Sequence, residues 1–272
     1  MSRVGGYSLS MHETPPPSSR VWVVSAFKGG VGKTSTAVNL AAVWAASGRR
    51  ILVIDLDPQG AVAAFLGLDV TDDGIALVDS LLDERPLTPI RTAGIDLCVG
   101  GKELGAVEVD LHKRSLPWQS TLADLIRATD GYDEVLIDTP PGFGALTMLA
   151  LVAGSSVIIP TTLDPASRWT IGEVLAAMRV VQTRPASRPL NPGLRLAGIL
   201  PTLVDARSRL ARLVLDELAS DDEHPLLAPR IPARAAVREA TLSGVPIVRA
   251  DPSNPAAIAY RELARHLMEE GR

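Results

Sequence analysis

One segment near the start of the chain restricts the possible folds more than any other. The apolar run Val21–Phe27 leads into a glycine-rich segment, Lys28-Gly29-Gly30-Val31-Gly32-Lys33-Thr34-Ser35, and a helical pattern over Thr34–Ser47 follows at once. In a strand–loop–helix unit, glycines let backbone N–H groups converge on phosphate oxygens, and the helix N-terminus adds the positive end of its dipole. We therefore expect this segment to bind a nucleoside triphosphate, with Lys33 on its β- and γ-phosphates and Thr34 on a Mg²⁺ ion.

Strand-like and helix-like patterns alternate along the rest of the chain. Several apolar runs are apolar throughout, as strands of a parallel sheet covered on both faces are. Besides Val21–Phe27, we expect strands at Ile51–Leu56, Ile95–Val99, Glu134–Asp138, Ser155–Pro160, Arg195–Leu200 and Leu227–Ile231. After the first helix, we expect helices at Trp118–Ala128, Ile171–Gln182, Ala206–Ala219, Arg234–Leu242 and Asn254–Glu270. This alternation predicts one doubly wound α/β domain, a mostly parallel sheet with helices on both faces.

The two ends of the chain have different patterns. Residues 1–20 are polar and include three consecutive prolines, which predicts a disordered tail before a single domain at 21–272. In the last predicted helix, Ile258, Leu263 and Leu267 form an apolar stripe. We expect this stripe to face the core and Tyr260 to lie off it.

Composition excludes some classes of protein. No stretch approaches eighteen uninterrupted apolar residues, so no membrane span is expected. The one cysteine, Cys98, lies in an apolar run, which predicts a buried, unreactive thiol in a reducing cytoplasm. A formal net charge of −4 argues against binding nucleic acid through bulk charge. Residues 179–249 nevertheless contain eleven arginines against seven acidic residues, so a basic face is possible there.

Two of the predicted strands end in acidic residues. Asp55 and Asp57 close the run that starts at Ile51, and Asp138 closes the run that starts at Glu134. Residues two apart on a strand share a face, and ligands of such sheets bind at the carboxyl ends of the strands. Pro58 restrains the preceding Asp57 to an extended backbone. We therefore expect all three carboxylates to lie near the phosphates.

The glycine-rich segment departs from the plain phosphate-loop pattern. Phe27 stands where that pattern has glycine, and a second lysine, Lys28, precedes the double glycine. The segment resembles the deviant Walker A motif of the ParA/MinD group of ATPases. Asp55-Leu-Asp57-Pro-Gln-Gly resembles the switch I of that group, and the run ending at Asp138 resembles its Walker B and switch II. The resemblance covers nearly all of 21–272 and implies a P-loop NTPase fold of the deviant Walker A type.

The resemblance also implies a role for each of these residues in Mg²⁺-dependent ATP hydrolysis. Lys28 is expected to reach the nucleotide of the partner subunit in a face-to-face homodimer, as an arginine finger does in trans. Asp55 is expected to serve the Mg²⁺ shell, Asp57 to orient the attacking water, and Asp138 to hold Mg²⁺ through a water. In such proteins the adenine lies between the loops that follow two late strands, where the candidates are Thr202, Asp205 and Pro232.

Members of the group divide by what they position. A nitrogenase iron protein needs cluster cysteines, and a bacterial tyrosine kinase needs a C-terminal tyrosine cluster; a lone Cys98 and a solitary Tyr260 fit neither. A MinD-like membrane ATPase would end in a basic amphipathic helix, whereas acidic residues stand at 269 and 270 here, so no membrane partner is expected. The sequence favours a ParA-like partitioning ATPase, cytoplasmic and nucleoid-associated, that positions a plasmid or chromosome. The alternatives are an ATPase that positions a protein assembly along the nucleoid and, less favoured, a MinD-like regulator.

A ParA-like protein binds DNA without sequence preference as an ATP dimer, and a ParB-like activator stimulates hydrolysis and release. No helix-turn-helix pattern precedes the domain, so we expect contacts to DNA from the arginine-rich half. The candidates are Arg195, Arg207, Arg234 and Arg238. Their plainer interpretation is solvated helix faces with local ion pairs. The sequence after Ile231-Pro232 also departs from the group, reading Ala-Arg-Ala-Ala-Val-Arg rather than Arg-Asn-Val-Arg.

Overall fold

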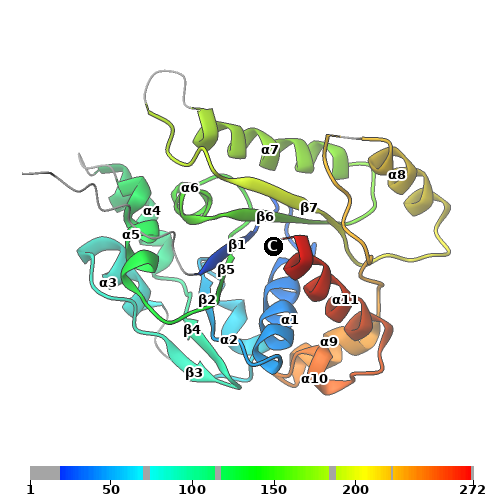
Figure 1. The fold of residues 1–272 in the computed structure, drawn as a ribbon, viewed down its shortest axis with the longest axis horizontal. Helices are drawn as coiled ribbons and strands as arrows, with labels where there is room; N and C mark the ends of the chain where they lie inside the picture. Colours follow the sequence, from blue (N-terminus) through cyan, green and yellow to red (C-terminus); the bar gives the residue numbers. More distant parts are fainter. Residues whose placement is uncertain (1–18, 70–73, 114–117, 184–187, 222, 271–272) are drawn as a thin grey trace, which may run out of the picture.

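In the described part of the chain, seven strands form one sheet in the order β3-β4-β2-β5-β1-β6-β7 (Figure 1). The computed structural model describes residues 19–69, 74–113, 118–183, 188–221 and 223–270. The strands are β1 Arg20–Val24, β2 Ile51–Asp55, β3 Ile90–Thr92, β4 Ile95–Cys98, β5 Glu134–Asp138, β6 Ser156–Thr161 and β7 Arg195–Pro201. Every neighbouring pair is parallel except β3 with β4. The predicted doubly wound, mostly parallel sheet is confirmed.

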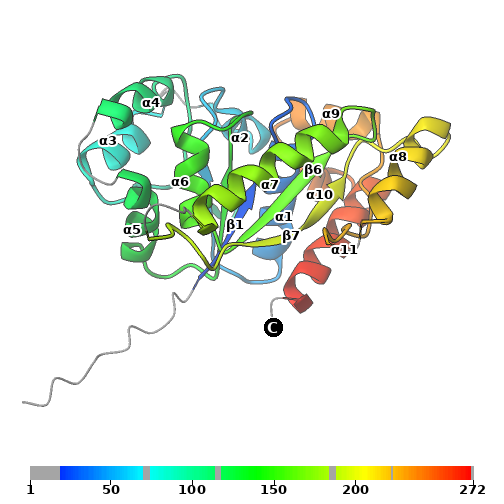
Figure 2. The same ribbon diagram turned by 90° about the horizontal axis from the view of Figure 1, so that it is seen from above.

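Helices cover both faces of the sheet, as Figures 1 and 2 show. One face carries α1 Lys33–Ala46, α2 Ala61–Phe65, α9 Ala235–Leu242, α10 Ile247–Ala250 and α11 Pro255–Glu270. The other carries α3 Ile75–Asp83, α4 Leu104–Lys113, α5 Thr121–Ala128, α6 Ala145–Ala153 and α7 Ser167–Thr183, with a short 3₁₀ helix at Trp118–Ser120. Helix α8, Arg209–Ala219, lies beyond the β7 edge. None of the helices in the described part of the chain is both long and apolar enough to cross a lipid bilayer.

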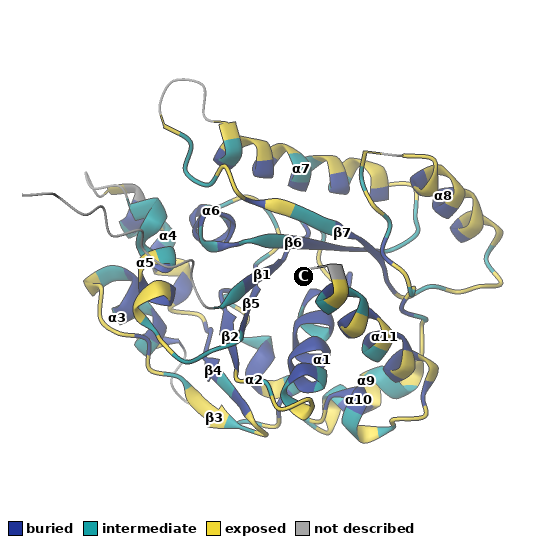
Figure 3. Cartoon of the chain, in the orientation of Figure 1, coloured by how far each residue is buried: buried dark blue, intermediate teal, exposed yellow. Residues whose placement is uncertain are grey.

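Each face of the sheet has its own hydrophobic core, because successive strand residues point to opposite faces. In β1, Val21 and Val23 pack in the layer beneath α3–α7, while Trp22 and Val24 pack in the layer beneath α1 and α11. The central strands β1, β2, β5 and β6 are buried almost throughout, whereas β3 at the edge is largely exposed (Figure 3). This explains why the strand sequences are almost continuously apolar.

The central position of β1 determines where the polar strand ends meet. Val24, the last residue of β1, pairs in register with Asp138 of β5, which in turn pairs with Asp55 of β2. The segment after β1 therefore leaves the sheet directly beside two aspartates. Their strands are adjacent in space although 83 residues separate them in sequence.

Two sequence predictions about the fold are wrong. Leu227–Ile231 is not a strand: it runs beside β7 and donates from Leu227 and Ile231, but Pro229 between them has no N–H to continue a ladder. On α11, Tyr260 is buried at 2% exposure and Ile258 is 42% exposed, the reverse of the expectation. The buried face of α11 includes the small residues Ala256, Ala257 and Ala264, which allow close packing on α1.

The predicted tail at 1–20 falls largely outside the described residues. The antiparallel strand β3 and the helices α2, α3, α4, α6 and α10 are additional to the sequence predictions. Cys98 is buried as expected, and burial raises the pKa of its thiol to about 12.

Candidate functional site

The glycine-rich segment turns from β1 into α1 through backbone conformations that favour glycine. Gly30 and Gly32 have φ values of +73° and +87°, in the left-handed region. Gly32 is the N-cap of α1, and no side chain caps the first turn. The N–H groups of Lys33, Thr34 and Ser35 therefore have no partner within the helix, and they lie at the positive end of its dipole. This arrangement suits a phosphate group.

A hydroxyl and a carboxylate from separate segments meet at the start of α1. The Thr34 hydroxyl donates a hydrogen bond of 2.6 Å to Oδ2 of Asp138. The other oxygen of Asp138, Oδ1, is buried and has no hydrogen-bond partner among the described residues. Burial raises the pKa of this carboxyl to about 7, against the hydrogen bond from Thr34 and the charge of Lys33. An unsatisfied buried oxygen beside a hydroxyl is the donor set expected around a hard cation.

The expected Mg²⁺ fits this pair of donors. Within the described residues no three His, Cys, Asp or Glu side chains cluster closely enough to form a metal site of their own. A cation held here would therefore take most of its ligands from phosphate and water. Mg²⁺ is commonly bound in this way, with one or two protein oxygens and the phosphates of a substrate.

Lys33 lies deep in the same site. It is 7% exposed, and burial lowers the pKa of its ammonium, opposed by the charges of Asp138 and Asp57. The buried ammonium of Lys33 lies beside carboxylates and the N-terminus of α1. In this position it can also contact a phosphate bound at that end of the helix. The structure thus brings Lys33, Thr34 and Asp138 together as the sequence predicted.

Asp55 has a role that the sequence did not reveal. Its two oxygens accept backbone N–H groups, Oδ1 from Asp57 at 3.0 Å and Oδ2 from Val62 at 3.1 Å. Burial and the charge of Asp138 raise the pKa of this carboxyl well above its usual range. Gly100 passes so close that a Cβ there would lie 2.5 Å from the Asp55 carbonyl oxygen. In this structure Asp55 therefore braces the loop that carries Asp57; its place in a Mg²⁺ shell stays a prediction.

Asp57 stands at the turn that follows β2. Its Oδ1 accepts the N–H of Gln59 at 2.9 Å, and its carbonyl accepts the N–H of Gly60 at 2.9 Å. Because these bonds fix the turn, the carboxylate has a defined direction while remaining partly exposed. Its charge also acts on Lys33 and Asp138. Asp57 is therefore close to the phosphate-binding end of α1, as expected.

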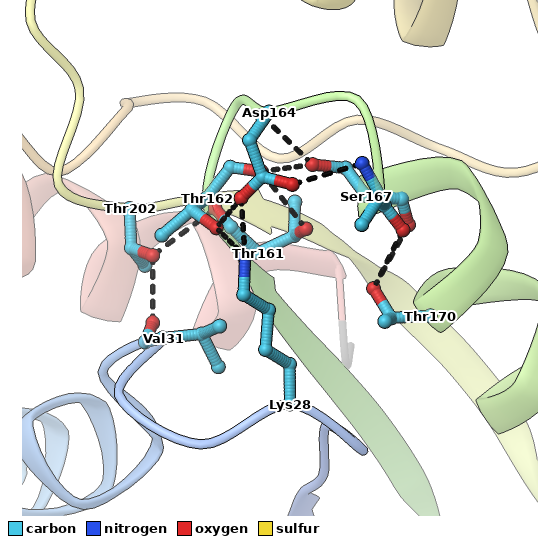
Figure 4. A network of polar contacts seen from close by, with 9 residues as sticks. Lys28, Val31, Thr161, Thr162, Asp164, Ser167, Thr170 and Thr202 are labelled. Carbon is cyan, nitrogen blue, oxygen red and sulfur yellow. Dashed lines mark hydrogen bonds and ion pairs between the residues drawn. The ribbon is translucent and has the colours of Figure 1, made fainter.

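Lys28 is held within its own chain. Its ammonium lies 2.5 Å from Oδ2 of Asp164 and 3.4 Å from the Thr162 hydroxyl (Figure 4). Both partners belong to the loop between β6 and α7. This pair could not be predicted from the sequence, because Asp164 and its neighbours match no motif.

Thr202 supports the phosphate loop from beneath. It is 1% exposed, and its hydroxyl lies 2.7 Å from the Val31 carbonyl and 3.1 Å from the Thr161 carbonyl (Figure 4). Gly32 packs against the same side chain, since a Cβ there would lie 3.8 Å from Thr202 Cβ. The hydroxyl is used to hold the loop. Whether Thr202 also contacts adenine stays a prediction.

The other adenine candidates line a cavity of about 320 Å³. Asp205 and Pro232 lie in its wall with Leu163 and Val204. Parallel pairing joins the two loops there, with Val204 N–H donating to the Ile231 carbonyl at 3.0 Å. The cavity has an apolar wall and a carboxylate, but whether adenine occupies it stays a prediction.

An aromatic pair links the phosphate loop to the loop after β5. The rings of Phe27 and Phe143 stack with centroids 6.3 Å apart, and Phe143 is 42% exposed. Phe27 is the residue that replaces the glycine of the plain loop pattern. The stack offers a physical reason for the replacement, because it joins the residue before Lys28 to the segment that follows Asp138.

The four arginine candidates do not form one surface. Arg195 begins β7 and pairs in register with Ser156, so it lies at the amino edge of the sheet, opposite the phosphate loop. Arg207, Arg234 and Arg238 are exposed and follow the carboxyl ends of the sheet. Arg207 forms an ion pair with Asp205 at 3.3 Å. Because parallel strands place their two ends on opposite edges, Arg195 lies away from the other three candidates; contact of any of the four with DNA stays a prediction.

Comparison with known proteins identifies the family. A family model described as "AAA domain" matches residues 19–195. The chain is 35% identical over 243 residues to the chromosome-partitioning ATPase Soj of Thermus thermophilus, and the aligned region covers 89% of this chain and 92% of that protein. It is 33% identical over 260 residues to the chromosome partitioning protein ParA of Caulobacter vibrioides, 93% and 95% of the two lengths. The chain belongs to the ParA/MinD family of ATPases.

A solved structure resembles this member of the ParA/MinD family over nearly its whole length. It carries the name cobyrinic acid a,c-diamide synthase, from Mycobacterium smegmatis, and contains an ATP analogue and magnesium. The TM-score is 0.80 at 33% identity, with 93% of this chain and 97% of that chain covered. The fold of this chain and the sequence of its phosphate loop are thus those of the ParA/MinD family, and the site geometry is consistent with both.

Proposed function

We propose that this chain is a partitioning ATPase that hydrolyses ATP with Mg²⁺ to position a plasmid or chromosome. The observation that carries the proposal is the contact of Thr34 with the buried Asp138, whose second oxygen is unsatisfied among the described residues, beside the buried Lys33 at the start of α1. Relatives that align along nearly their whole length are named for chromosome partitioning. The site geometry therefore supports the ATPase chemistry, and the relatives support the role in partitioning.

ATP binding uses the phosphate loop in the way the sequence suggested. The N–H groups at the start of α1 donate to phosphate oxygens, and Lys33 neutralises charge on the β- and γ-phosphates. Thr34 and Asp138 would hold the Mg²⁺ ion. When bound, Mg²⁺ would neutralise charge that develops on the phosphate oxygens during transfer. Thr202 keeps the loop in place by its bond to the Val31 carbonyl.

Hydrolysis needs a positioned water and a second cation. Asp57 orients the water, since its carboxylate is fixed in direction by the turn after β2 and stays partly exposed. Lys28 supplies the second cation to the nucleotide of a partner copy, so turnover requires an ATP-dependent homodimer. This requirement makes the dimer the active species.

The dimer binds DNA without reading its sequence, and a ParB-like activator ends the bound state by stimulating hydrolysis. Arg234 and Arg238 support this step, because both are exposed on the first turns of α9 at the carboxyl edge. One protomer would neutralise few phosphates, so pairing two protomers makes affinity depend on ATP. The protein is then cytoplasmic and nucleoid-associated.

Three other functions are distinguishable. A positioning ATPase for a protein assembly would share the ATP cycle and DNA binding but require a different activator. A MinD-like regulator would co-sediment with anionic liposomes. Amide synthesis, suggested by the name of the Mycobacterium smegmatis structure, commonly draws ammonia from glutamine through a reactive thiolate. This chain has one cysteine, which is buried with its pKa raised to about 12; that favours partitioning.

The test combines nucleotide binding, association and DNA binding on one preparation. Calorimetry with Mg²⁺ and ATP should give binding by the wild type and none by Lys33→Ala, because the phosphates lose their direct cation. Light scattering should show a dimer with ATP, a monomer with ADP, and a much weaker dimer for Lys28→Ala.

Electrophoretic shifts with unrelated duplexes should then show equal affinities with ATP and weak or no binding with ADP. Since the logarithm of affinity falls by about 0.9 per neutralised phosphate for each logarithm of salt, the dimer should lose affinity steeply with salt. A competent ATP dimer that binds no duplex at low salt would remove the partitioning role. It would leave an ATPase that acts on a protein scaffold.

A further inference from the structure

We infer that Asp164 is a positioning residue that restrains Lys28 in the monomer and so opposes ATP-dependent dimerisation. The inference rests on the proposed function, in which Lys28 acts on the nucleotide of a partner copy. It assigns a role to Asp164 and predicts the direction of its effect: loss of the Asp164 charge should strengthen the dimer.

The carboxylate of Asp164 is fixed by its own loop, independently of Lys28. The Thr162 hydroxyl donates to Oδ2 at 2.5 Å, and the Ala166 N–H donates to Oδ1 at 2.9 Å. The Asp164 N–H donates to the Ser167 hydroxyl at 3.0 Å (Figure 4). A carboxylate held by two bonds from its own segment, on a backbone held by a third, needs no rearrangement to receive a cation. Asp164 is therefore a preformed site for the Lys28 ammonium.

Lys28 occupies that site in the isolated chain. Its ammonium contacts Oδ2 of Asp164 at 2.5 Å, and the two side chains are 39% and 29% exposed. Burial acts to raise the pKa of Asp164, but hydrogen bonds from Lys28, Thr162 and the Ala166 N–H outweigh it and lower that pKa. The carboxylate is thus charged near neutral pH and neutralises the lysine in cis.

A lysine neutralised in its own chain cannot fully stabilise phosphate charge on another chain. To reach a partner nucleotide it must give up the contact with Asp164. A symmetric dimer opens two such pairs, one in each protomer. Since partly exposed ion pairs are worth little individually, each should weaken dimerisation by about twofold to fivefold. Because both pairs must open, the two factors multiply, and together they should raise the dimer dissociation constant by about fourfold to 25-fold.

Asp164→Asn tests this with little change of shape. The amide keeps an oxygen that can accept the Ala166 N–H, and its NH₂ can donate to Thr162, but it carries no charge to hold Lys28. The matched control is Asp79→Asn, which removes the exposed ion pair with Arg85 at 2.9 Å on α3. Thermal unfolding of both variants verifies that they are folded.

Sedimentation velocity with Mg²⁺ and a non-hydrolysable ATP analogue measures the dimer constants of the wild type, Asp164→Asn, Lys28→Ala and the double variant. Asp164→Asn should dimerise about fourfold to 25-fold more tightly than the wild type, with a smaller difference at high salt. Asp79→Asn should match the wild type. The double variant should match Lys28→Ala, because Asp164 acts only through Lys28.

Two sets of results overturn different claims. If the wild type dimerises and Lys28→Ala does not, but Asp164→Asn dimerises equally or more weakly, the restraint is wrong and the proposed function stands. Tighter dimerisation of the double variant than of Lys28→Ala would also remove the restraint, since Asp164 would act by another route. If Lys28→Ala dimerises as the wild type does, the proposed trans role itself fails.

Discussion

The Thr34 hydroxyl and the Asp138 carboxylate, 104 positions apart in the chain, share a hydrogen bond of 2.6 Å at the start of α1. The bond occupies one carboxylate oxygen and leaves the other buried without a partner in the described part of the chain. A buried acceptor without a partner is costly in a folded protein. A cation with its water shell would satisfy it, so metal and nucleotide should bind together.

Asp138→Asn should lower the affinity for Mg²⁺ more than the affinity for nucleotide. The phosphate loop and Lys33 remain, whereas the buried negative charge that favours the cation is removed. We expect the Mg²⁺ concentration for half-maximal hydrolysis to rise at least about tenfold, as is typical for a lost charged partner. A Mg²⁺ titration at fixed ATP measures this, with the exposed Asp124→Asn as control. An unchanged midpoint would contradict the metal role of Asp138.

Asp57→Ala should bind ATP normally and hydrolyse it far more slowly, so that the ATP dimer accumulates. The phosphate loop and the metal side are untouched, while the group that orients the water is lost. Single-turnover hydrolysis and light scattering on the same samples measure both effects. Normal turnover, or failure to bind ATP, would show that Asp57 has a different role.

Thr202→Val should destabilise the free protein and lower its ATP affinity. Valine has the shape of threonine but cannot donate to the Val31 carbonyl, and a buried acceptor left alone costs about 1–3 kcal/mol. Urea unfolding and calorimetry give the two numbers. Thr202→Ser, which keeps the hydroxyl, is the control and should lie close to the wild type. A variant with wild-type stability and affinity would mean that the loop does not depend on Thr202.

Charge reversal of the arginines should separate the two edges of the sheet. Arg234→Glu and Arg238→Glu should each weaken DNA binding for all sequences alike and leave basal hydrolysis largely unchanged. Arg195→Glu makes the same change in net charge at the opposite edge and should have a small effect. Filter binding across a salt series compares them. Equal losses for all three variants would indicate an effect of total charge only.

Glu134→Gln should change how stability depends on pH. Glu134 is fully buried and accepts bonds from Trp22 at 2.6 Å and Arg49 at 2.7 Å. Burial raises its pKa above 4.5, despite the Trp22 bond and the charges of Arg20 and Arg49. The folded state therefore holds its proton more tightly than the unfolded state. The stability from this proton is complete below pH 4.5 and is lost as pH rises through the raised pKa.

Glutamine has no such proton to lose. The stability of Glu134→Gln relative to the wild type should therefore increase from pH 4.5 upward and level off once Glu134 is ionised. Urea unfolding at several pH values measures the difference, in which the titrations common to both proteins cancel. A difference that stays constant with pH would show that the pKa of Glu134 is not raised.

The part of the site that lies in one continuous segment could be predicted from the sequence. Lys33 and Thr34 follow from the glycine-rich loop, because strand, turn and helix dictate their placement locally. Asp138 was predictable too, since a parallel sheet brings the carboxyl ends of its strands to one edge. The same rule places Arg195 at the other edge of the sheet, away from the other three candidate arginines. The excess of arginines over acidic residues in 179–249 did not reveal this separation.

Residues that act through long-range contacts could not be assigned from pattern. Thr202 was placed correctly after β7, but only the packed structure shows that its hydroxyl meets Val31. Asp164 belongs to no motif, and its contact with Lys28 depends on the relative position of two loops. On α11, Leu263 and Leu267 face the core as predicted, but Ile258 does not. Alanines allow close helix packing there, and Tyr260 fills the remaining space.

The bond between Thr202 and Val31 has a consequence for the order of synthesis. The phosphate loop leaves the ribosome early, yet the side chain that supports it is made 171 residues later. A growing chain therefore displays the nucleotide-binding sequence without the scaffold that holds it in shape. The supported form of the loop therefore exists only after Thr202 has been made. A polypeptide released before β7 is complete would carry the whole motif and lack its support.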